Sequence, residues 1–210
     1  YMQVKGLLEI RGKDGLIRPY VELDGQRLPL CPVWSREHCW IPRFVSEEQA
    51  LRFTCTYLTP VGERALVLRL SVQNQSAEPR TVRFGTDGQW DQTLHEVNET
   101  TELTEGREAY GSGWNHMFIF SQKPGLPLFA FAPCVADPQQ FAEIDQQARW
   151  NRSDFAYDIY RETVLQPGET AVLDIPWGVG YEGVAASTSA KELLRQGFDA
   201  VYDRTVRWLS

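Results

Sequence analysis

The stretch LRFTCTYLTPVGERALVLRLSVQN, residues 51–74, decides the fold of this 210-residue chain. Its second half alternates strictly, with Leu66, Leu68, Leu70 and Val72 on one face and the intervening residues on the other. Its first half alternates in the same way around aromatic, cysteine and threonine side chains. A Thr-Pro-Val-Gly turn joins the two halves. The stretch therefore predicts an antiparallel β-hairpin with one buried face.

The same rhythm of short strands and turns continues to about residue 180. Asp24-Gly25 predicts a tight hairpin, and Gln166-Pro167-Gly168-Glu169 predicts another turn. About a dozen short strands without a helix among them predict an all-β fold, a large two-layer antiparallel β-sandwich. Besides the hairpin at 51–74, strands are expected over residues 16–23, 27–30, 80–86, 117–121, 128–131, 155–164 and 171–177.

Charge and composition exclude several classes of protein. A net charge of −7 argues against a nucleic-acid groove, which needs clustered positive charge. No apolar run approaches the ~18 residues that a membrane span requires. The acidic stretch 87–112 is expected to be a solvated face, built from a long loop or irregular strands. Four cysteines and no visible signal sequence favour a cytoplasmic location.

The hydrophobic spacing becomes helical near the end of the chain. Ser189 begins a capping box, and Leu194, Phe198, Val201 and Trp208 then follow at steps that place them on one stripe of an amphipathic helix. We therefore predict two parts, a β-sandwich domain over residues 1–186 and an amphipathic linker helix over 187–210. The helix is expected to lead toward a helical domain absent from this sequence. Its stripe should contact the sandwich or that domain.

Motifs for catalysis or cofactor binding are weak. Cys31, His38 and Cys39 offer three metal ligands without a visible fourth, so the cysteines are expected to be free thiols packed as small hydrophobes. Residues 178–183 match the pattern G-x-G-x-x-G. A dinucleotide site needs a helix that starts at once and a parallel strand after it. We expect the helix only near Ser189, and interpret the glycines as a flexible exit from the sheet. No catalytic residue, metal or cofactor is nominated.

Two clusters place tryptophan beside polar groups: Trp90 with Asp91, and Trp114 with Asn115 and His116. Sugar rings stack on aromatic faces, and their hydroxyls bond to amide, acid and imidazole groups. These five residues are candidate carbohydrate contacts. The alternative is that the two tryptophans fill the ends of the sandwich. Weaker candidates of the same kind are Trp34, Trp40 and Trp150.

Residues 51–74 resemble a hairpin in the N-terminal sandwich of bacterial glycoside hydrolases and phosphorylases that carry an (α/α)6 toroid. There, a strand of aromatic and threonine residues turns through Pro-Gly and returns as an aliphatic strand ending in Asn. Residues 165–180, LQPGETAVLDIPWGVG, resemble the late strand pair of that domain. The closing helix with Arg207-Trp208 resembles the linker into the toroid. The families include bacterial glucoamylases, amylo-α-1,6-glucosidase-like debranching enzymes, processing α-glucosidase relatives and disaccharide phosphorylases.

The resemblance implies a galactose-mutarotase-like super-sandwich that packs on the toroid of the same polypeptide and helps to wall its sugar cleft. The catalytic carboxylates of those families stand on toroid loops, so no catalytic residue is carried over to this chain. The implied function is a non-catalytic N-terminal domain of a glycoside hydrolase or sugar phosphorylase. An independent carbohydrate-binding module is the main alternative, and a structural or adhesive sandwich is the third. An oligosaccharide partner suits the first two hypotheses; nucleic acid and membrane partners are not expected.

Overall fold

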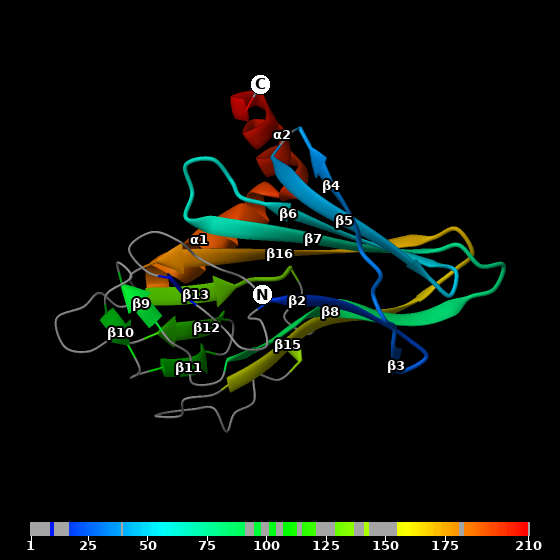
Figure 1. The fold of residues 1–210 in the computed structure, drawn as a ribbon, viewed down its shortest axis with the longest axis horizontal. Helices are drawn as coiled ribbons and strands as arrows, with labels where there is room; N and C mark the ends of the chain where they lie inside the picture. The colour runs from blue at the N-terminus through cyan, green and yellow to red at the C-terminus, as the bar shows by residue number, and fades with distance from the viewer. Residues whose placement is uncertain are drawn as a thin grey trace.

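The computed structural model describes residues 9–10, 17–38, 40–90, 95–97, 101–103, 107–112, 115–120, 129–136, 141–142, 155–180 and 183–209. Its two main sheets are antiparallel and form a sandwich (Figure 1), so the predicted fold class is confirmed. The larger sheet has the order β11 (Arg107–Ser112), β12 (Asn115–Phe120), β13 (Phe129–Pro133), β16 (Thr170–Gly180), β7 (Ala65–Asn74), β6 (Leu51–Leu58), β5 (Ile41–Glu48), β4 (Val33–Glu37). The smaller sheet has the order β14 (Phe141–Ala142), β15 (Phe155–Leu165), β8 (Arg80–Trp90), β2 (Arg18–Leu23), β3 (Gln26–Arg27). A third sheet joins β1 (Glu9–Ile10), β9 (His95–Val97) and β10 (Thr101–Leu103).

The predicted central hairpin is present. β6 and β7 pair from Leu51 opposite Asn74 to Leu58 opposite Val67. Within β7, Leu68, Leu70 and Val72 are fully buried and belong to the main core. The other face of β7 is covered as well, because the two helices pack on it. β7 is thus buried on both faces and lies near the middle of the larger sheet.

The main core fills the space between the two sheets. The smaller sheet contributes Val82 and Phe84 from β8 and Ile159 from β15, all buried. The larger sheet contributes aromatic and aliphatic side chains from β6, β7 and β16, among them Phe53 and Trp177. Burial of this apolar surface is the main source of the sandwich's stability.

Two connections cross between the sheets at one end of the sandwich. β7 leads to β8 through residues 75–79, and β15 leads to β16 through the predicted turn at 166–169, so this turn joins different sheets rather than closing a hairpin. Asn74 is fully buried between them. Its Nδ2 donates to the carbonyls of Glu78 (2.8 Å) and Leu165 (3.0 Å), and its Oδ1 accepts from the backbone and hydroxyl of Ser76. This side chain holds both crossings together.

The C-terminal segment forms two helices rather than one, α1 (Gly183–Gln196) and α2 (Phe198–Leu209). The expected start at Ser189 is wrong, because Ser189 lies inside α1. The buried stripe of α1 consists of Ala186, Ala190 and Leu193. Because its first two members are alanines, the beginning of the helix gives little hydrophobic signal in the sequence. Gly197 divides the helices with a φ of 80°, and its N–H is shared by the carbonyls of Leu193 and Leu194. Neither helix of the described part is long and apolar enough to cross a membrane.

Two elements of the larger sheet lie outside the predicted strands. β4 and β5 contain or follow prolines, and Pro42 stands within β5. Proline removes a backbone donor and weakens a strand prediction.

In the acidic stretch 87–112, β8 extends to Trp90, and β9, β10 and β11 follow. The expectation there is a long loop or irregular strands, and the described residues form strands.

Candidate functional site

A second core lies on the outer face of the larger sheet, where the helices pack. The sheet supplies Ile41, Leu58, Ala65 and Val67, all buried. The helices supply three buried side chains that cover them: Leu193, Phe198 and Val201. Two residues of the predicted stripe, Phe198 and Val201, are therefore buried against the sandwich, whereas Leu194 is half-buried and Trp208 is exposed. The break at Gly197 shifts the stripe from Leu194 to Leu193.

Arg69 fixes the first turn of α2 to the sheet. This arginine stands on the outer face of β7, and its guanidinium forms two 2.8 Å bonds to the carboxylate of Asp174 on β16. It also bonds to Asp199 in α2 and lies 4.0 Å above the Phe198 ring. Burial alone would lower the pKa of Arg69, but the two carboxylates raise it above its usual value. The guanidinium is therefore charged, and it joins two strands to one helix.

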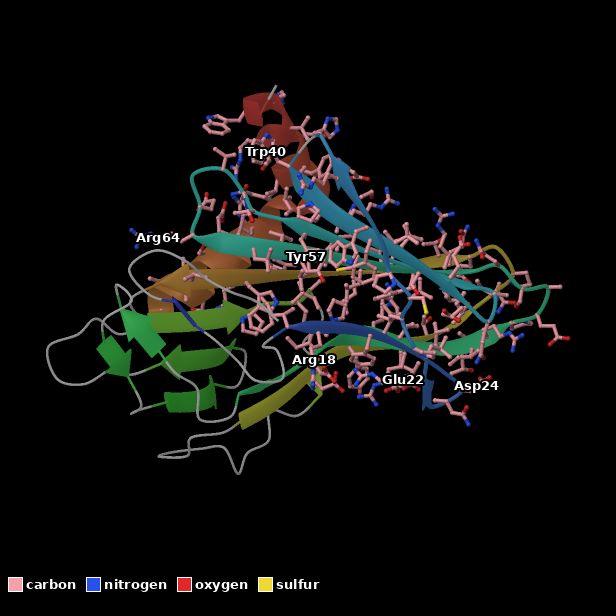
Figure 2. The ribbon with its side chains drawn as sticks, in the orientation of Figure 1. Arg18, Glu22, Asp24, Trp40, Tyr57 and Arg64 are labelled. Atoms are coloured by element: carbon pink, nitrogen blue, oxygen red, sulfur yellow. The ribbon has the colours of Figure 1, made fainter. Side chains whose placement is uncertain are left out.

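Tyr202 holds the middle of α2 to the edge of the larger sheet. Its hydroxyl donates to Glu37 at 2.9 Å, and Glu37 also accepts from Arg43. Partial burial and the bond to Glu37 raise the pKa of Tyr202 to about 12. The His38 ring meets Tyr202 edge-on at 6.0 Å. The loop between β4 and β5 thus touches α2, and Figure 2 shows Trp40 of this loop beside the helix.

The far end of α2 borders a groove of about 700 Å³. Its lining comes from α2, from the end of α1 and from the β6–β7 turn: Val61, Gln196, Ala200, Arg204, Arg207 and Trp208. Trp208 and Trp40 are each 69% exposed. Figure 1 shows the last turns of α2 extending past the sheets. We call the groove residues together with Trp40 the α2 face. It combines the two exposed indoles of Trp40 and Trp208 with the side chains of Arg204 and Arg207.

The glycines at 178–183 have a packing role. β16 ends at Gly180 and α1 begins at Gly183, so a helix does follow the strand at once, contrary to the expectation. A Cβ at Gly178 would lie 1.9 Å from the carbonyl oxygen of Ala186, which shows how closely α1 lies on β16. β16 pairs antiparallel with both neighbours, so the parallel sheet of a dinucleotide site is not formed around it. The interpretation of a flexible exit is replaced by close helix–strand contact.

Two of the three potential metal ligands, Cys31 and His38, lie in the described part of the chain. Three described cysteines are free: Cys31 is exposed, Cys55 is buried and Cys134 is half-buried, while Cys39 lies outside the described residues. Burial raises the pKa of Cys55 to about 12, which makes it an inert core thiol. His38 faces Tyr202. Among the described residues, no group of three or more His, Cys, Asp or Glu side chains could hold a metal ion.

The structure does not describe the side chains of the five candidate carbohydrate contacts. The backbone places Trp90 at the end of β8 and Asn115 and His116 at the start of β12, whereas Asp91 and Trp114 lie outside the described residues altogether. Their role stays a prediction. Of the weaker candidates, Trp150 also lies outside, and Trp40 belongs to the α2 face.

Trp34 stands on an aromatic ledge at the edge strand β4. Its ring stacks on Tyr57 at a centroid distance of 5.9 Å and meets Phe44 edge-on at 5.1 Å. Tyr57 is labelled in Figure 2. Phe44 is buried and packs in turn on Phe53. The indole is nevertheless 58% exposed. The sequence does not distinguish Trp34 from the other candidate tryptophans. Whether a side chain on an edge strand is exposed depends on how far the facing sheet extends.

The outer face of the smaller sheet is covered by paired charges. Asp87 accepts from Arg18 and Arg27 at 2.9 and 2.8 Å. Asp158 accepts from the buried Tyr20 hydroxyl at 2.7 Å and from Arg83. Burial and the bond to Asp158 raise the pKa of Tyr20 above its usual value. Figure 2 shows Arg18 and Glu22 of β2 on the side away from the larger sheet.

Comparison with known proteins gives a fold likeness. No family model and no curated protein matches the chain. A candidate kojibiose phosphorylase from the human microbiome matches with a TM-score of 0.64 and 9% identity, over 96% of this chain and 28% of that one. A polysaccharide lyase matches with a TM-score of 0.51 and 14% identity, over 85% of this chain and 27% of that one.

A bacterial glucoamylase complexed with acarbose gives a TM-score of 0.49 at 11% identity. The chain spans little more than a quarter of the length of the first two structures. At such identities the likeness shows the fold. The resemblance inferred from residues 51–74 and 165–180 is confirmed at that level: this sandwich is the architecture of a segment in larger carbohydrate-active enzymes.

Proposed function

We propose that this chain is the N-terminal sandwich domain of a larger carbohydrate-active enzyme, a glycoside hydrolase or a sugar phosphorylase. One observation carries the proposal: the fold likeness takes in 96% of this chain but 28% of the candidate kojibiose phosphorylase. A domain of this kind serves a catalytic domain elsewhere in the polypeptide. The sandwich itself is non-catalytic under this proposal, and its contribution is positional.

The α2 face is the surface proposed to hold the helical domain. Aromatic residues and arginine are enriched where proteins meet. Trp208 and Trp40 are both 69% exposed, and Arg204 and Arg207 line the groove beside Trp208. These features support a helical partner of the same polypeptide as the occupant, since the structures of similar fold are more than three times as long as this chain.

The seating of α2 suggests how the sandwich would act. Arg69 fixes the first turn of the helix and Tyr202 fixes its middle, so the direction of its last turn is set by the sheet. A domain attached beyond that turn would start from a fixed position relative to the sandwich. Loops of both parts could then form one sugar cleft, in which correct alignment of the substrate contributes directly to rate.

The mass of the polypeptide in the cells that express it tests the proposal first. Antibody capture followed by intact-mass spectrometry should give a value well above the 24.0 kDa of this chain. A native mass of 24.0 kDa would overturn the enzyme-domain proposal and leave the independent binding module as the better hypothesis.

A pair of variants in the longer protein tests the α2 face. Trp208→Glu should lower kcat and lower the temperature at which the two domains separate, because it places a charge in the proposed contact. Val164→Glu is the matched control: Val164 is 52% exposed on β15 of the other sheet. Equal effects of the two variants, or none from Trp208→Glu, would contradict docking at the α2 face.

A further inference from the structure

The unequal width of the two sheets leaves the core-side face of β4 uncovered. Outward from the β7–β8 crossing, the larger sheet continues through β6, β5 and β4, whereas the smaller sheet continues through β2 and the two-residue β3. Trp34 is directly opposite Phe44 in the β4–β5 ladder, so both side chains lie on the core side. Phe44 is 4% exposed and Trp34 is 58% exposed. The apolar face of the sandwich therefore extends past its covered part and ends in one indole.

The Trp34 ring is held in place before any ligand arrives. Tyr57 stacks against it with an interplanar angle of 27°, and Phe44 meets it at 60°. Phe44 itself rests on Phe53, which is buried in the main core. A ring fixed from below in this way loses little rotamer entropy when a ligand covers its open face. Such a ledge is suited to stacking.

Among the described residues of β4, Trp34 is the one exposed large apolar side chain on the core-side face. Val33, the other exposed large apolar residue of β4, points to the opposite face of the sheet because side chains alternate along a strand. A stable protein–protein contact needs on the order of 800 Å² from each partner. One indole face matches a smaller partner, a single pyranose ring whose C–H face is apolar.

A hydrogen-bond donor stands on the same side of the strand. Arg36 is two residues beyond Trp34, so its side chain leaves the same face of β4. It is exposed and makes no ion pair with any described residue. Arginine offers five N–H donors, which suits the ring of hydroxyls around a sugar. Stacking and hydroxyl recognition are thus available next to each other.

We infer that Trp34, seated on Tyr57 and Phe44 and flanked by Arg36, is a stacking subsite for one gluco-configured ring of an oligosaccharide. Glucose-type rings carry their hydroxyls equatorially and so present a continuous C–H face to an indole. The choice of a sugar as ligand rests on the proposed function, whereas the ledge itself rests on the packing of aromatic side chains from β4, β5 and β6. The subsite is separate from the α2 face.

Calorimetric titration with maltopentaose, isomaltopentaose and cellopentaose tests the subsite. At least one sugar should bind, and Trp34→Leu, which removes the flat ring but keeps an apolar side chain, should weaken that binding on the order of tenfold. Trp34→Phe keeps a ring and should lose less, and Arg36→Ala should also weaken binding. Trp208→Leu is the matched control, since its indole is more exposed than that of Trp34, and it should bind as the parent does.

Three results would overturn the subsite. The first is no heat with any of the three sugars. The second is binding by Trp34→Leu equal to that of the parent. The third is a change of oligomeric state, in which Trp34→Leu converts a dimer into a monomer and thereby shows that the ledge covers a second copy. None of these bears on the native mass or on Trp208→Glu, so failure of the subsite and failure of the proposed function are distinguishable.

Discussion

Phe198 is the residue on which the seating of α2 depends most. Its side chain is buried against the outer face of the sheet, where the Arg69 guanidinium lies 4.0 Å from the centre of its ring. Replacing a buried phenylalanine by alanine costs about 3–5 kcal/mol through lost burial and the cavity left behind. Loss of the cation–π contact adds roughly 0.5–1 kcal/mol. The two losses together amount to about 3.5–6 kcal/mol, and because Arg69 keeps Asp174 and Asp199 we expect Phe198→Ala to cost about 3.5–4 kcal/mol, the low end of that range.

This cost should appear in α2 before it appears in the sandwich. Helices at the edge of a domain open locally with less free energy than the core strands. Hydrogen exchange followed by mass spectrometry should therefore show protection of α2 falling by about two and a half to three orders of magnitude, which is the equivalent of about 3.5–4 kcal/mol. Protection of β6 and β7 should change far less.

Trp208→Ala is the internal control for Phe198→Ala, because Trp208 is on the same helix and 69% exposed. It should change protection of α2 by less than about threefold, as most surface substitutions do. If Phe198→Ala leaves α2 as protected as Trp208→Ala does, the second core does not hold the helix and the reasoning is refuted. If all strands lose protection together with α2, the helix is part of the global unfolding unit and the local-opening argument is wrong.

Three further predictions concern the sandwich and its clamps. Asn74→Ala should lower the free energy of unfolding in urea by about 3 kcal/mol, because buried partners lose their bonds; Ser76→Ala, which removes one half-buried hydroxyl, should cost about 1 kcal/mol. Tyr202 has its pKa raised from 10.0 to about 12, so the stabilising effect of its bond to Glu37 is complete below pH 10 and is lost as the pH rises to about 12. Urea titrations across that interval should show a steeper loss for the parent than for Tyr202→Phe, and parallel losses would contradict the bond. Thr86→Val should raise the melting temperature and add about 1 kcal/mol, since Oγ1 of Thr86 is buried without a hydrogen-bond partner in the described structure; a lower melting temperature would show that the hydroxyl is satisfied.

The sandwich was predictable where one strand face carries an uninterrupted row of large apolar residues. β7 and β6 meet that condition, and the turns at Gly25 and Gly62 require the positive φ values that glycine adopts most easily, 78° and 79°. β5 does not meet it. Ile41 is buried under the helices while Phe44 and Ser46 are buried in the sandwich, so both faces hold apolar side chains and the alternation disappears. Pro42 then obscures what remains of the pattern.

The helices were predicted in type but not in extent, for a related reason. Hydrophobic periodicity detects large side chains, whereas α1 is buried through Ala186 and Ala190, which let its backbone lie on Gly178. A close helix–strand contact selects small residues, and small residues carry little periodic signal. Trp34 illustrates the same limit for the candidate site. Its neighbours Phe44 and Tyr57 come from other strands, and only strand order determines that no element of the smaller sheet covers it.

The two outer faces of the sandwich differ in what they can offer to a partner. On the smaller sheet, the charges are already matched, with Arg18 and Arg27 bound to Asp87 and Arg83 bound to Asp158. A partner seated there would have to remove paired charges from water, and such burial seldom gains free energy. On the larger sheet, the helices cover the outer face, and Trp208 of α2 and Trp40 beside β5 expose indoles that gain free energy when covered. This asymmetry is why the α2 face, rather than the charged face, is where a helical domain is expected to pack.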